Sequence, residues 1–132
     1  MKFSTKTTYG LRALANISHN YQGESISLAK IAQEENISMK YLERIFSLLK
    51  KENIVKSSKG VGGGYILARK PENISLYEVI NSLEQGFNLF HCLGKNGKNY
   101  CSSKCNCHVV GALDKIQRSI ILNLKNIHLS DL

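Results

Sequence analysis

The sequence predicts a mainly α-helical fold with one small β-hairpin. Apolar residues recur at helical spacing in five segments of the 132-residue chain. Two short segments typical of strands, residues 54–58 and 65–68, flank a glycine-rich turn. A hydrophobic content of 42% supports one core. We expect three parts: a domain at 1–85, a cysteine-rich loop at 86–108 and a helical part at 109–132.

The first three helices are predicted from their caps and apolar spacing. Ser4 is expected to cap a helix over residues 4–20. A second short helix begins after Ser27 and ends near residues 35–36. Ser38 is a good N-cap for a third helix. One buried stripe of that helix consists of Leu42, Ile45, Phe46 and Leu49.

The outer face of the third helix is left to Lys40, Tyr41, Glu43 and Arg44. Two short helices joined by three or four residues, the second basic outside, are typical of a helix-turn-helix. The hairpin that follows would be its wing, and four glycines would let the tip lie close to a phosphate backbone. A nucleotide-binding loop is the poorer interpretation, because the Gly-Lys-Ser/Thr ending is missing.

The charge of the chain favours a polyanionic partner. The formal net charge is +8, which suits nucleic acid or an anionic lipid surface. Residues 40–70 hold eight Lys or Arg against two acids. No apolar run is long enough to cross a membrane, and no signal peptide follows Met1. We therefore expect a cytoplasmic protein with reduced thiols and no membrane partner.

Two more helices complete the expected fold. Ser75 and Glu78 form a capping box for the fourth helix, which ends at Gly86. A long helix then covers residues 108–126 and needs a partner for its apolar side. That partner would be its copy in a second chain, its own domain, or both. The apolar stripe consists of Val109, Leu113, Ile116, Ile120, Leu124 and Ile127.

All four cysteines of the chain lie within sixteen residues. In a reducing compartment such a cluster indicates metal or redox chemistry rather than structural disulfides. An all-thiolate set suits a [2Fe–2S] or [4Fe–4S] cluster, and Cys/His sets also suit zinc. The candidate ligands are Cys92, Cys101, Cys105, Cys107 and His108, with His91 at the other edge.

Other classes of function fit the sequence less well. A redox enzyme would use Cys105 and Cys107, but no thioredoxin-like frame surrounds them. The chain has no Ser-His-Asp set and no paired carboxylates in a cleft context, so we do not expect an enzyme. A metal-binding module that meets protein rather than DNA is disfavoured by the basic helix and wing.

Several motifs together resemble one family. They are Leu28-Ala29-Lys30-Ile31-Ala32, Ile37-Ser38-Met39-Lys40-Tyr41-Leu42-Glu43, Gly60-Val61-Gly62-Gly63-Gly64-Tyr65 and Leu76-Tyr77-Glu78-Val79-Ile80. Over essentially the whole chain, the sequence is similar to the IscR/NsrR/CymR-type winged-helix regulators, the Rrf-two family. The resemblance implies a homodimer that binds a partly palindromic operator. In many members it also implies an iron–sulfur cluster held by three cysteines.

Carried onto this chain, the resemblance implies Cys92, Cys101 and Cys107 as cluster ligands. Five residues separate the last two, as in the family, but eight separate the first two where five are usual. The loop is therefore enlarged, and Cys105 is an extra thiol. The places where relatives supply a fourth ligand hold Val110 and Thr8. The candidates for a fourth ligand are Cys105, His108 and His91.

These residues predict a DNA-binding transcriptional regulator, expected to act as a repressor, whose operator affinity is controlled by the cluster. The alternative is a cluster-free, thiol- or zinc-responsive regulator of the same fold. Arg44 is expected to read guanine and Glu43 to accept from cytosine. Phosphate and sugar contacts are expected from Ser38, Lys40, Tyr41, Lys56, Lys59 and the wing amides at Gly60.

Overall fold

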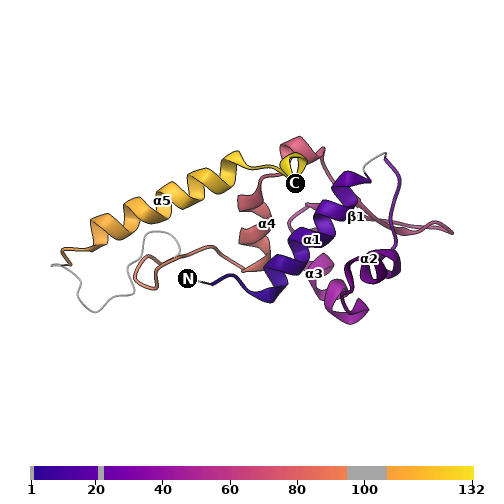
Figure 1. The fold of residues 1–132 in the computed structure, drawn as a ribbon, viewed down its shortest axis with the longest axis horizontal. Helices are drawn as coiled ribbons and strands as arrows, with labels where there is room; N and C mark the ends of the chain where they lie inside the picture. The colour runs from indigo at the N-terminus through magenta and orange to yellow at the C-terminus, as the bar shows by residue number, and fades with distance from the viewer. Residues whose placement is uncertain (1, 21–22, 95–106) are drawn as a thin grey trace.

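The computed structural model describes residues 2–20, 23–94 and 107–132 and confirms the predicted fold class (Figure 1). Helices gather at one end, a two-stranded hairpin projects beyond them, and the last helix extends away on the opposite side. The elements in chain order are α1 (Thr5–His19), α2 (Leu28–Glu35), α3 (Met39–Lys51), β1 (Val55–Ser58), β2 (Gly64–Leu67), the 3₁₀ helix η1 (Pro71–Asn73), α4 (Leu76–Leu83), α5 (Val110–Asn126) and the 3₁₀ helix η3 (Leu129–Asp131).

The core lies among α1, α2, α3 and α4, which pack against one another. Leu14 of α1, Ile31 of α2 and Phe46 of α3 are fully buried there. The predicted stripe of α3 is buried as expected. The same core includes Leu129 of η3, which is 1% exposed. The 3₁₀ helix η3 therefore packs back against the body formed by the first four α-helices.

The turn between α2 and α3 is short and locally determined. Ser27 and Ser38 cap their helices by accepting hydrogen bonds from the N–H groups of Lys30 and Tyr41, each at 3.2 Å. Asn36 adopts the left-handed conformation with a φ of 53°, which ends α2. Ile37, within this turn, is buried in the core. These features confirm the predicted pair of helices.

The hairpin is antiparallel, with Val55 opposite Leu67 and Ser58 opposite Gly64. Its second strand also pairs with Ile26, which precedes α2. A Cβ atom on Gly64 would collide with the carbonyl group of Ile26. From the sequence, the wing glycines are expected to let the tip approach DNA. Gly64 is instead required by its close contact with the Ile26 backbone inside the protein.

The start of α1 differs from the prediction. Ser4 occupies the N-cap position, but its side chain makes no capping bond to the helix. Its hydroxyl instead donates to Oε1 of Glu84 at 2.7 Å, and its backbone N–H donates to the same oxygen at 3.0 Å. The Thr7 hydroxyl donates to it as well. A carboxylate at the end of α4 therefore caps α1, where an anion is favoured by the helix dipole.

This cap predicts a pH dependence of stability. Burial raises the pKa of Glu84, but hydrogen bonds from Thr7 and Ser4 outweigh burial and hold that pKa below its usual value. The contribution to stability is then present above the unfolded pKa of about 4.3 and is lost as the pH falls through the lower folded value. We expect Glu84→Gln to lower the free energy of unfolding by about 1–2 kcal/mol at pH 7.

Urea denaturation of both proteins between pH 7 and pH 3 measures this effect. The difference between wild type and Glu84→Gln is expected to shrink as the medium becomes acidic. A matched control is Glu72→Gln, which changes an exposed carboxylate of η1 and is expected to cost less than about 0.5 kcal/mol. A difference that stays constant down to pH 3 would contradict the role of the Glu84 charge.

α4 and α5 connect the body to the rest of the chain. The predicted capping box of Ser75 and Glu78 is confirmed. α5 begins at Val110, two residues later than predicted, and contains no buried residue. It packs against α4. After α5 the chain returns to the core, where the N–H of Leu129 donates to the carbonyl of Ile74 at 3.0 Å. Within the described ranges, no helix has both the length and the apolar character needed to cross a membrane.

Candidate nucleic-acid interface and cysteine loop

The outer face of α3 presents the predicted polar side chains. Because its apolar stripe is buried, Lys40, Glu43 and Arg44 are exposed, as is Ser38 at the N-cap. Tyr41 differs from them because it is only partly exposed. Its ring meets the ring of Tyr9 edge-on, with 5.7 Å between centroids. Tyr41 therefore also packs α3 against α1.

Contacts between α1 and the end of α2 hold this face in place. The guanidinium of Arg12 donates to Oε2 of Glu35 at 3.2 Å and to the Glu35 carbonyl at 2.6 Å. It also lies over the Tyr9 ring at 5.7 Å from the centroid. Glu35 is the last residue of α2, so Arg12 satisfies a carbonyl at a helix end. These contacts fix α2 against α1 just before the turn that leads into α3.

The wing places its predicted residues at the surface. Lys56, Lys59 and Gly60 are all exposed. Gly60 has a φ of 117°, a conformation that favours glycine. A hydrogen bond of 2.9 Å from the Gly63 N–H to the Gly60 carbonyl closes the tip. All eight predicted DNA-binding residues thus lie on α3, its N-cap or the wing, and only Tyr41 is partly buried.

The start of the cysteine loop is attached to both α4 and α5. Asn81 of α4 accepts a hydrogen bond from the Phe87 N–H at 2.9 Å, and Gln117 of α5 accepts from the Leu89 N–H at 3.0 Å. Leu93 is 8% exposed and anchors the segment that carries Cys92. No local sequence pattern marked Asn81 or Gln117, because each bonds a backbone group that lies outside its own helix.

The structure describes three of the five predicted ligands, Cys92, Cys107 and His108. Cys92 and Cys107 have free, partly exposed thiols, and His108 is exposed just before α5. Cys101 and Cys105 lie outside the described residues. In the part of the chain that is described, no three His, Cys, Asp or Glu residues form a group that could hold a metal ion. The free thiols of Cys92 and Cys107 are nevertheless the soft donors that iron–sulfur clusters and zinc prefer.

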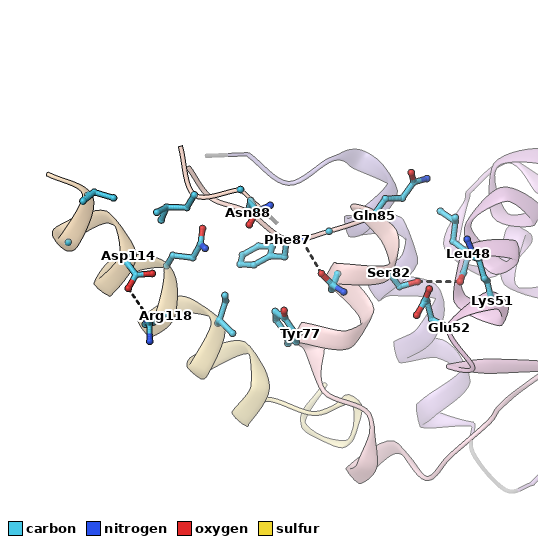
Figure 2. Close-up of a pocket in the computed structure, with 18 residues that line it drawn as sticks. Leu48, Lys51, Glu52, Tyr77, Ser82, Gln85, Phe87, Asn88, Asp114 and Arg118 are labelled. Carbon is cyan, nitrogen blue, oxygen red and sulfur yellow. Dashed lines mark hydrogen bonds and ion pairs between the residues drawn. The ribbon is translucent and has the colours of Figure 1, made fainter. Parts of the chain in front are cut away.

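A groove of about 1120 Å³ lies between α4 and α5. Figure 2 shows Tyr77 and Phe87 between the two helices, with Asp114 and Arg118 on α5. The Tyr77 and Phe87 rings meet edge-on, with centroids 6.2 Å apart. Asp114 accepts from Arg118 at 2.6 Å. The groove is therefore lined by two aromatic rings and an ion pair, by the start of the cysteine loop and by the end of α3.

The helix-turn-helix, the adjacent hairpin and the basic surface that they share define a winged helix-turn-helix protein. Residues 3–132 match the Rrf2 family, which is described as iron-dependent transcriptional regulator. The chain belongs to the Rrf2 family. The family membership predicted from the motifs is therefore confirmed.

Individual relatives agree with this assignment. A putative HTH-type transcriptional regulator of Haemophilus influenzae is 39% identical over 100 residues, which are 75% of this chain and 67% of that protein. The HTH-type transcriptional regulator IscR of Escherichia coli is 34% identical over 97 residues, 74% of this chain and 60% of IscR. The match thus spans well under two thirds of IscR. These relatives are named as regulators and not as enzymes.

The fold also resembles a solved structure along its whole length. CymR, the global cysteine regulator of B. subtilis, superposes with a TM-score of 0.79. That comparison covers 99% of this chain and 95% of CymR at 29% sequence identity. The predicted winged-helix fold, with a wing after the helix-turn-helix and a long helix near the end of the chain, is thereby confirmed.

Proposed function

We propose that this protein is a DNA-binding transcriptional regulator that represses its target promoters. The observation that carries the proposal is the arrangement of α3. One face of the helix is buried in the core, and the opposite face exposes Lys40, Glu43 and Arg44. The wing adds Lys56 and Lys59 to the same basic region of the sequence. A helix of this kind fits the major groove of DNA.

Base contacts and phosphate contacts have different roles at this surface. Arg44 can donate two hydrogen bonds to guanine, and Glu43 can accept one from cytosine. Lys40, Lys56 and Lys59 neutralise phosphates without reading sequence. Smaller phosphate or sugar contacts come from the Ser38 hydroxyl, the Tyr41 ring and the Gly60 amide.

Substituting Arg44 tests the reading role. We expect Arg44→Ala to weaken binding to a preferred duplex by about 1–3 kcal/mol, because a bidentate base contact is lost. The duplex is first enriched from a random library by the wild-type protein and binding is measured by fluorescence anisotropy. The control, Lys115→Ala, removes an exposed cation that belongs to α5 and not to the proposed DNA-binding surface. Equal affinity and the same enriched sequence for Arg44→Ala would contradict the role.

We propose that two copies of the chain dimerise through α5, because this helix exposes apolar side chains. Ile116 is 47% exposed, and Leu113 and Ile120 of the same helix are only partly buried. The three lie on one side of α5, because residues three and four apart are neighbours on a helix surface. A single chain gains little by exposing such side chains. Pairing with a second copy would cover them and would present two α3 helices to a partly palindromic operator.

The cysteine loop is proposed to hold an iron–sulfur cluster. Cys92, Cys101 and Cys107 would bind it, with Cys105 or His108 completing the set; zinc is the alternative ion. A bound cluster would supply a redox-sensitive cross-link among the thiolates. Cys92 lies five residues after Phe87, whose N–H is bonded to α4, and Cys107 lies three residues before the start of α5 at Val110. Ligation of both would therefore fix the start of α5 relative to α4.

The chain's own contacts would carry that constraint to DNA. Gln117 ties the segment before Cys92 to α5, and α4 packs against α3. α5 sets the spacing of two reading heads in a dimer. A cross-linked loop and a released loop would then favour different spacings. A coupling of about 1–3 kcal/mol is enough to change operator occupancy several-fold.

A second candidate keeps the fold and drops the iron. CymR is described as a cysteine regulator, and the free thiols of Cys92 and Cys107 could respond directly to oxidants or bind zinc. Protein purified without oxygen separates the candidates. An iron–sulfur protein shows visible absorbance together with iron and sulfide, a zinc protein shows zinc alone, and a thiol-responsive protein shows no metal.

A further inference from the structure

The second strand of the wing is attached, where it begins, to the segment that precedes α2. Ile26 and Tyr65 exchange two backbone hydrogen bonds, with N–O distances of 2.9 Å and 2.8 Å. Gly64 approaches the Ile26 backbone so closely that no side chain fits. The segment at Ile26 therefore pairs with the edge of β2 that β1 does not occupy. Sliding of β2 past this partner would break both hydrogen bonds.

The tip of the wing is attached to the same segment. Ser25 donates its hydroxyl proton to the Gly62 carbonyl at 2.6 Å, across 37 residues of sequence. Gly62 belongs to the turn that the Gly63–Gly60 hydrogen bond closes. Ser25 therefore fixes the tip, whereas the Ile26 bonds fix the start of β2.

α3 holds the hairpin from the other side. The Phe46 and Tyr65 rings meet at 62° with centroids 4.8 Å apart. At the last turn of α3, the Lys50 ammonium donates to the Ser57 hydroxyl at 2.9 Å. Ser57 pairs with Tyr65 in the hairpin register. Lys50 thus bonds Ser57, the residue of β1 that pairs with Tyr65. Tyr65 is itself held by Phe46 and by Ile26.

We infer that Lys50 and Ser25 are positioning residues that hold the wing at a set angle to α3 before DNA binds. The inference rests on the proposed function and deepens it. Charge alone assigns Lys50 to the phosphates, like the other seven basic residues in 40–70. Its bond to Ser57 gives it a different role. Because the wing is already ordered, less conformational freedom is lost on binding.

Salt dependence separates positioning from phosphate contact. Each phosphate contact contributes a slope of about 0.9 to the plot of log affinity against log salt. We compare Lys50→Met with Lys59→Met on a duplex enriched by the wild-type protein, between 50 and 200 mM KCl. Lys59→Met is expected to reduce the slope by about 0.9 for each contacting protomer. Lys50→Met is expected to leave the slope unchanged and to weaken binding about 2- to 10-fold.

Removing the acceptor gives an independent measurement. Ser57→Ala leaves the Lys50 charge in place and is expected to weaken binding as much as Lys50→Met does. The double variant is expected to be no weaker than either single variant, because both remove one interaction. Ser25→Ala is expected to weaken binding with the wild-type slope. All these side chains are at least partly exposed, so the variants should fold.

Two results would overturn the inference. One is a slope for Lys50→Met that falls as far as the slope for Lys59→Met. The other is wild-type affinity for Ser57→Ala and Ser25→Ala. Failure of the proposed function looks different, because the wild-type protein itself would then bind the enriched and a scrambled duplex equally well. The inference would fall with it.

Discussion

Replacing Phe46 by alanine is expected to lower the free energy of unfolding by about 3–5 kcal/mol. Phe46 is fully buried, and its ring packs on Tyr65 of the wing. Alanine would leave a cavity between α3 and the hairpin, and the surrounding backbone could close it only in part. Since small domains have a total stability of about 5–15 kcal/mol, the loss is large. Urea denaturation followed by circular dichroism measures it.

The control for Phe46→Ala is Val61→Ala at the fully exposed tip of the wing. It also removes an apolar side chain and is expected to change stability by less than about 0.5 kcal/mol. Protomer concentration must be held constant, because the stability of a dimer depends on it. Equal and small losses for the two variants would contradict the description of the core.

Replacing Ile116 by glutamate is expected to convert a homodimer into monomers at micromolar concentration. Ile116 lies on the exposed apolar side of α5, where the proposed partner would bury it. A carboxylate without a partner at such an interface costs several kcal/mol. Sedimentation measures the change as a fall from twice the chain mass to the mass of one chain. Weaker operator binding is expected to accompany it.

The matched control is Lys115→Glu, which introduces the same side chain on another side of α5. The neighbouring positions differ by about 100° around the helix, and Lys115 is exposed. This variant is expected to sediment as the wild-type protein does. A wild-type protein that is already monomeric, or an Ile116→Glu variant that remains dimeric, would contradict dimerisation through this side of α5.

Features that depend on neighbouring residues were predictable from the sequence. The cap of α3 at Ser38, its buried stripe and the Ser75–Glu78 capping box all join residues within a few turns of one another. The outer face of α3 followed from the same periodicity. Its position beside the wing followed from the strand-turn-strand pattern that comes directly after α3. These features are determined by local geometry, which a sequence displays directly.

Contacts between distant residues were not predictable. Ser4 was expected to cap α1, but it bonds to Glu84, 80 residues away. Gly64 reads as part of a flexible turn, and only the structure reveals the Ile26 backbone beside it. Lys50 reads as one more cation for phosphate until its bond to Ser57 is seen. In each case the partner is brought close by the tertiary fold, which local spacing does not encode.

The ligand set of the cysteine loop remains a prediction. The structure places Cys92 and Cys107 on either side of the loop, and Cys101 and Cys105 lie outside the described residues. The clustering of all four in one segment indicates a shared site.

The most direct test measures operator affinity with the loop loaded and with it disabled. Wild-type protein reconstituted without oxygen from iron and sulfide is compared with the variant that carries Cys92→Ala, Cys101→Ala and Cys107→Ala, on one enriched duplex at one salt concentration. A ratio of affinities of about 5- to 150-fold is expected for a coupled site. Equal affinities for the two proteins would contradict control of DNA binding through the cysteine loop.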